Sequence, residues 1–212
     1  MSAIEGGNEA AGPRRFADAS RLLLRTTVFG AMDDLAADRP WAAITMAEIA
    51  RAAGVSRQTL YNEFGTRDEL AQAYVLWASE QFLDEIERVV GARPDDLGGA
   101  LQDAFRVFLE LAAEHPLVRA LEAATGAEGL HALVASSAGL PILLTSTERL
   151  TEFVLGNWPE LPVTDTRLVC ELLVRLAISH ATVPTVPPAV AAEQVSTVLG
   201  PFLVEVRAAL PH

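Results

Sequence analysis

A run of hydrogen-bonding side chains begins directly after the tripeptide GVS at positions 54–56. Its first members, Arg57, Gln58 and Thr59, are residue types that contact base edges, since Arg pairs with guanine, Gln with adenine, and the Thr methyl group meets thymine. Tyr61 adds an aromatic ring with a hydroxyl group that is suited to bonding a phosphate. These side chains would project together from the start of one helix, so contact with a nucleic acid is the first chemistry that the sequence suggests.

Two helices must flank the tripeptide if these side chains are to be presented to a partner. Thr45 and Glu48 have the Thr-x-x-Glu spacing of a capping box, which predicts that a helix starts at Thr45. Gly54 is suited to the left-handed backbone that ends a helix, and Ser56 is suited to capping the next one. The result is a helix-turn-helix, a motif whose second helix enters the major groove of DNA.

The rest of the chain also shows helical spacing of apolar residues and no alternating strand pattern, so we expect an all-α fold. Thr66 and Glu69 form a second capping box, at the start of a long helix. Residues 1–12 lack periodicity and are expected to be a disordered tail. The predicted helices cover 13–38, 45–53, 56–64, 66–90, 96–114, 116–124, 128–137, 141–156, 164–180 and 188–210.

Arg67 is a cation in the first turn of a predicted helix, where it opposes the helix macrodipole. A phosphate bound at the same helix start would explain this residue, and a solvated Arg is the simpler alternative. The free N–H groups of the helix that starts at Thr45 would also suit a phosphate. The predicted DNA contacts are Thr45, Ser56, Arg57, Gln58, Thr59, Tyr61, Asn62 and Arg67.

The segment ITMAEIARAAGVSRQTLYNEFGTRDEL, residues 44–70, resembles the DNA-binding segment of the TetR/AcrR family of bacterial transcriptional regulators. The resemblance covers about a third of the chain and implies a three-helix DNA-binding domain, here 13–65. It further implies a helical ligand-binding and dimerisation domain, here 66–212, with about nine to ten helices in all. The family implies a homodimer that binds a palindromic operator and responds to a small molecule, most simply as a repressor, with activation as the alternative.

Glu63 departs from the family pattern, which often has His or another non-acidic residue at this position. An acid close to DNA phosphates is unfavourable. We therefore expect Glu63 to turn away, to pair with Arg67 four residues on, or to weaken DNA binding.

The charge is unevenly distributed along the chain, whose net value is −12. Residues 13–67 hold eight Arg and six acids, which gives +2, and the rest holds eight Arg and 22 acids, which gives −14. The acidic part should therefore point away from DNA. The single Cys170 and the lack of a signal or membrane-spanning run lead us to expect a cytoplasmic protein with no membrane partner.

Dimerisation is predicted for the last two helices, which carry apolar stripes at i, i+3 and i+4 spacing. TetR-like proteins pair two such helices with their copies in a four-helix bundle. The alternative is that both helices pack only inside their own subunit. The predicted interface residues are Leu172, Leu176, Val195, Leu199, Phe202 and Val206.

A ligand cavity is implied by the family resemblance for the region around residues 75–155. The segments SRQTLYNEFGTRDELAQAYV and LVRLAISHATVPTVPP are similar to an actinobacterial subgroup that includes regulators of alkane and fatty-acid metabolism. A hydrophobic or fatty-acid-like inducer would suit an apolar lining, and a carboxylate on it could meet Arg106, His115 or His131. The predicted ligand contacts are Trp77, Phe105, Arg106, Phe108, Leu109, Leu133 and Leu144.

Other functional classes have weaker support in the sequence. It has no Gly-rich phosphate loop, no Cys/His metal spacing and no nucleophile elbow, so we expect no enzyme activity, metal or cofactor. The rival from another class is a helix-turn-helix that binds a protein instead of DNA. Binding to DNA with a steep salt dependence would separate the two.

Overall fold

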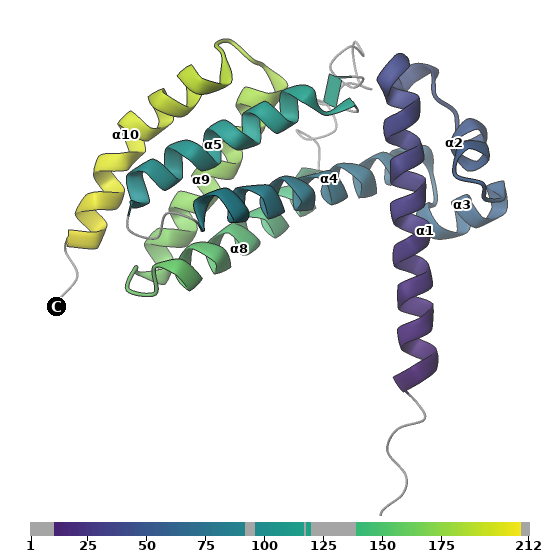
Figure 1. Ribbon diagram of the computed structural model, residues 1–212, viewed down its shortest axis with the longest axis horizontal. Helices are drawn as coiled ribbons and strands as arrows, with labels where there is room; N and C mark the ends of the chain where they lie inside the picture. Colours follow the sequence, from purple (N-terminus) through teal and green to yellow (C-terminus); the bar gives the residue numbers. More distant parts are fainter. Residues whose placement is uncertain (1–10, 92–95, 117, 120–138, 209–212) are drawn as a thin grey trace, which may run out of the picture.

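The computed structural model describes residues 11–91, 96–116, 118–119 and 139–208, and every regular element within these ranges is a helix. A small lobe contains α1 (Ala11–Asp38), the short 3-10 helix η1 (Trp41–Ala43), α2 (Met46–Ala52) and α3 (Arg57–Phe64). A larger lobe contains α5 (Leu97–Glu114), α8 (Leu140–Asn157), α9 (Val163–Thr182) and α10 (Pro188–Ala208). The long helix α4 (Arg67–Val90) joins the two lobes (Figure 1).

The predicted helices agree closely with these bounds. The expected tail at 1–12 and the expected helices at 116–124 and 128–137 lie wholly or mostly outside the described residues. The all-α prediction is confirmed for the described part, where eight α-helices stand against the nine to ten expected for the whole chain.

Local interactions explain why the small lobe folds as it does. Both predicted capping boxes are present, Thr45 with Glu48 and Thr66 with Glu69. Gly54 has a φ of 68°, the left-handed conformation predicted for it. Ser56 caps α3, because its hydroxyl accepts a hydrogen bond from the backbone N–H of Thr59. The turn that separates α2 from α3 is thus fixed by residues within a few positions of one another.

An aromatic cluster joins α1 to the start of α4. The ring of Phe29 on α1 lies 5.5 Å from Phe64, 5.4 Å from Tyr74 and 5.3 Å from Trp77, measured between ring centroids. Phe29 and Tyr74 are completely buried. The first turns of α4 therefore belong to the core of the small lobe, and the lobes share this helix.

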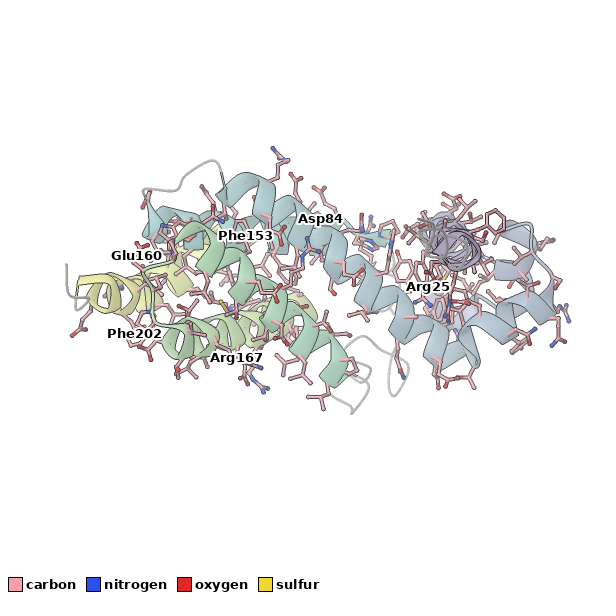
Figure 2. All side chains as sticks on the ribbon, turned by 90° about the horizontal axis from the view of Figure 1, so that it is seen from below. Arg25, Asp84, Phe153, Glu160, Arg167 and Phe202 are labelled. Carbon is pink, nitrogen blue, oxygen red and sulfur yellow. The ribbon has the colours of Figure 1, made fainter. Side chains whose placement is uncertain are left out.

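The larger lobe is built around α5, which packs against α4 on one side and α10 on the other. Helix α8 packs against α9 and α4. Arg149 of α8 is bonded to three groups on α4: the carboxylates of Glu87 and Asp84 and the backbone carbonyl of Glu80. Figure 2 places Asp84 on α4 and shows Phe153 and Phe202 in this lobe, far from Arg25 in the small one.

Candidate DNA-binding surface and ligand cavity

Helix α3 separates its buried and exposed residues cleanly. Leu60 and Phe64 are buried against the small lobe. On the opposite side Arg57, Gln58 and Asn62 are exposed, and Tyr61 is half-exposed. The Gln58 side-chain amide donates to Asn62 Oδ1 at 2.9 Å, which orders two of these groups side by side. The helix therefore offers a polar, hydrogen-bonding face to a partner.

Ser56, Thr59 and Thr45 have structural partners at the helix starts. The Ser56 and Thr59 hydroxyl oxygens are 2.8 Å apart, and Thr59 is partly buried. The Thr45 hydroxyl donates to Glu48 Oε2 at 2.8 Å and accepts from the Glu48 backbone N–H. Thr45 and Ser56 cap helices, and the Thr59 hydroxyl is bonded to the Ser56 cap, so contact of these three side chains with DNA stays a prediction.

Arg67 has partners within the small lobe. Its guanidinium donates to the backbone carbonyls of Ile44 at 3.2 Å and Trp41 at 2.5 Å, and it lies 4.5 Å above the Trp41 ring centroid. These contacts hold the segment before α2 against the start of α4. They account for a cation in the first turn of a helix without a phosphate, whereas a phosphate contact stays a prediction.

Glu63 pairs with arginines of α1. Of the alternatives weighed for this residue, turning away agrees with the structure and pairing with Arg67 does not. The Arg21 Nε–H donates a bifurcated hydrogen bond to both carboxylate oxygens of Glu63, at 2.8 and 2.9 Å, and Arg25 Nη1 donates to Oε1 at 3.0 Å. Burial raises the pKa of Glu63, but the hydrogen bonds from the two arginines outweigh burial and hold the pKa below its usual value. The acid on α3 is therefore ionised, paired and turned away from the exposed face.

The predicted dimer residues fall into two groups. Leu172 and Leu176 on α9 are exposed, together with Leu168 one turn earlier, and so is Phe202 on α10. Val195 is buried within its own subunit and Leu199 is half-buried there, which favours for these two the alternative of packing inside the subunit. The Val206 side chain lies outside the described residues.

The larger lobe contains a cavity of about 180 Å³ with an almost wholly apolar lining. Helices α4, α5, α8, α9 and α10 all contribute to its wall. Cys170 lies in this wall, and burial raises the pKa of its thiol to about 11. A cavity of this character suits an aliphatic molecule better than a charged one.

The cavity brings together only part of the predicted ligand set. Phe105 and Phe108 line it. Arg106 does not, because it pairs along its own helix with Glu110 and Asp103. Leu133 and the alternative His131 lie outside the described residues, whereas His115 does line the cavity.

The remaining predicted contacts also lie away from the cavity. Trp77 belongs to the aromatic cluster, Leu109 is buried between α5 and α10, and Leu144 is exposed on α8. Lining residues outside the predicted set of ligand contacts include Tyr74, Phe82, Phe153, Trp158 and Cys170. Their apolar spacing marks them as inward-facing, but core and cavity wall share that spacing, so no sequence signal distinguishes them.

The described part of the chain supplies little for other chemistry. Within it, no group of His, Cys, Asp and Glu side chains is arranged to hold a metal ion. Among the same residues, no helix has both the length and the apolar character needed to cross a membrane.

Comparisons with known proteins agree with this architecture. Residues 31–74 match the family model of bacterial regulatory proteins of the tetR family, and residues 96–201 match that of the bacterial tetracyclin repressor C-terminal domain. The HTH-type transcriptional regulator AlkX of Mycobacterium tuberculosis is 34% identical over 187 residues, which is 88% of either chain.

Solved structures show the same fold. The crystal structure of the TetR family repressor AlkX from Dietzia sp., implicated in biodegradation of n-alkanes, is 35% identical with a TM-score of 0.76 and covers 86% of this chain and 96% of its own. A tetR-family regulator from Streptomyces coelicolor, at 20% identity, has a TM-score of 0.59 and covers 87% and 85%. The chain therefore belongs to the TetR family of bacterial helix-turn-helix transcriptional regulators.

Proposed function

We propose that this regulator is a repressor that binds a palindromic operator as a homodimer and is released by an aliphatic inducer. The observation that carries the DNA-binding part is the exposed face of α3, with Arg57, Gln58, Tyr61 and Asn62 free of the lobe's core. A helix that presents such groups can enter the major groove and contact base edges. Repression follows most simply, because a bound dimer needs only to exclude other proteins from the operator.

The operator is expected to be a palindrome because a homodimer has two-fold symmetry. A closed dimer presents two copies of α3 to two half-sites about one helical turn apart. The exposed leucines of α9 supply an apolar surface on the lobe that lies at the far end of α4 from α3 (Figure 1). Contact between two such surfaces would leave both copies of α3 free for DNA.

The cavity supports an aliphatic inducer, since most of the side chains in its wall are apolar and the surface that they expose to it is almost wholly apolar. The related repressor AlkX from Dietzia is implicated in n-alkane biodegradation, which favours the same ligand class here. Helix α4 would transmit the signal, because it lines the cavity from Tyr74 to Val90 and only Gly65 and Thr66 separate it from α3. The inducer acts by binding better to the arrangement that does not fit the operator.

Selection of genomic fragments by the purified full-length protein, followed by sequencing, tests the proposal. We expect enrichment of a palindrome that is lost with Tyr61→Ala and kept with Gln81→Ala, an exposed control on α4. Affinity for the selected site should fall steeply with salt, as phosphate contacts require. Medium-chain aliphatic compounds should then release the site. No enrichment by the wild-type protein, or enrichment that Tyr61→Ala leaves intact, would contradict the proposal.

A further inference from the structure

The cavity reaches the boundary between the lobes, and a polar group lies at that end. Tyr74 of α4 and His115, which directly follows α5, both contribute to the cavity wall. Tyr74 also belongs to the core shared with α1. The aliphatic inducer of the proposed function would therefore meet hydrogen-bonding atoms at the end nearest the DNA-binding lobe.

A chain of hydrogen bonds fixes the proton on His115. The Tyr74 hydroxyl donates to Asp33 Oδ1 on α1, so the Tyr74 oxygen can only accept from His115. His115 Nε2 lies 3.4 Å from this oxygen and 3.9 Å from Asp33 Oδ1. Both neighbours are acceptors, and Nε2 must therefore carry the proton. Burial lowers the pKa of His115, against the opposing effect of Asp33, so the ring is neutral near pH 7.

Nδ1 is consequently the acceptor of the neutral ring. It is buried, and within the described part of the chain it has no hydrogen-bond partner. The ring cannot easily turn to find one, because Phe82 packs edge-on at 5.3 Å and Tyr74 at 5.8 Å between ring centroids. A buried acceptor without a partner is costly, and a ligand that supplies a donor recovers that cost.

We propose, on the basis of the proposed function, that His115 Nδ1 accepts a hydrogen bond from the hydroxyl group at the end of an aliphatic alcohol. An alkane has no donor, and an ether or a carboxylate offers only acceptors to an acceptor atom. His115 is thus a specificity-determining residue that selects the alcohol among molecules with the same alkyl chain.

The position of His115 also connects the ligand to the DNA-binding lobe. Its Nε2–H points to the Tyr74–Asp33 pair, which joins α4 to α1. Hydrogen bonds in a chain polarise one another, so a donor at Nδ1 strengthens the bond from Nε2. The hydroxyl group of the alcohol would therefore influence the contact between Tyr74 and Asp33 of α1 through His115.

Binding of matched compounds to the full-length protein tests the proposal. Titration calorimetry would compare 1-decanol with decyl methyl ether, in which a methyl group replaces the donated proton, and with decanoate. We expect the wild-type protein to bind decanol about tenfold more tightly than the ether, in line with one buried hydrogen bond. Decanoate is ionised at neutral pH and should bind no better than the ether. Tighter binding of decanoate than of decanol would assign the polar end to an anion and overturn the proposal.

Variants assign the preference to His115. His115→Phe keeps an aromatic ring against Phe82 but removes the acceptor, so the preference for decanol should vanish while ether affinity stays within about twofold. Tyr74→Phe removes the hydroxyl that sets the proton on Nε2 and should reduce the preference. His180→Phe is the matched control, since His180 packs edge-on to Phe105 and is not part of the cavity wall.

The outcomes separate this proposal from the proposed function. If decanol and ether bind equally and both release operator DNA, the inducer class stands and the role of His115 is wrong. If neither compound binds to a protein that still binds its operator, both the aliphatic inducer and the role of His115 are wrong. A preference that His115→Phe retains also overturns the assignment, provided that the variant binds the ether normally.

Discussion

Glu63 shows how one residue on the helix predicted to contact DNA can carry a negative charge without opposing DNA. Its side chain is only 11% exposed, and both Arg21 and Arg25 donate to it from α1. Arg25 also lies over the rings of Phe29 and Phe64, at 5.5 and 5.1 Å. The carboxylate therefore fixes the orientation of α3 against α1, so its effect on DNA binding is indirect.

Glu63→Gln should weaken operator binding severalfold, even though it removes a negative charge. The amide cannot replace the charge-assisted bonds to both arginines, and we expect a loss of about 1–2 kcal/mol in the free energy of unfolding, since the site is partly exposed. Denaturant titration and operator binding would measure the two effects. Asp34→Asn, which changes the same charge at an exposed site on α1, is the control. If Glu63 merely repelled phosphates, the glutamine variant would instead bind DNA more tightly.

The pairing of Glu63 with Arg21 and Arg25 also predicts that the free energy of unfolding depends on pH. The pKa of Glu63 is lowered in the folded protein, so its stabilisation is complete above the ordinary carboxyl pKa and is lost as pH falls through the lowered value. The difference in unfolding free energy between the wild-type protein and Glu63→Gln should therefore be constant near neutral pH and shrink in acid. Denaturant titrations over a pH series would check this, and a difference that grew in acid would contradict the assigned pairing.

At the scale of elements, sequence reasoning succeeds where the interactions are local. Thr45 and Glu48 are three positions apart, and the capping box that they form needs no knowledge of the fold. The partners of Arg67 and Glu63 lie 23 to 42 positions away in the sequence. Local residue spacing therefore could not predict that Arg67 contacts Trp41 or that Glu63 pairs with α1. Apolar periodicity likewise identifies the inward side of α4 but cannot say that Phe82 borders a cavity while Trp77 does not.

The role of the turn between α2 and α3 can be tested with two glycine-to-alanine substitutions that should change stability in opposite directions. Gly54 has a φ of 68° with nothing within 4 Å of an added Cβ, so Gly54→Ala should cost about 1 kcal/mol of stability through backbone strain alone. Gly30 lies inside α1 and is equally uncrowded, so Gly30→Ala should instead stabilise by about 0.5–1 kcal/mol. Thermal or denaturant unfolding measures both. Equal effects at the two sites would contradict the special role of the turn.

For the molecule as a whole, the exposed stripe on α9 carries the dimer prediction. Leu168, Leu172 and Leu176 lie four residues apart and form one apolar line on a helix whose inner side, with Val169, Val174 and Ala177, is already buried. In a monomer this line of leucine side chains would leave apolar surface exposed to water, which is unfavourable. Contact with a second copy would bury it and hold two α3 helices at a fixed separation.

Leu172→Glu combined with Leu176→Glu should therefore convert the proposed dimer to a monomer that keeps its helical content. The glutamates would repel their copies across a two-fold interface, whereas on a monomer they would remain in water. Sedimentation velocity would report the mass, and operator binding should lose affinity for the full palindrome while retaining weak binding to a half-site. Leu144→Glu on α8 is the control, since Leu144 is 51% exposed and lies off this line, and it should leave both mass and binding unchanged. A double variant that remained dimeric would place the interface elsewhere, on a surface that contains neither leucine.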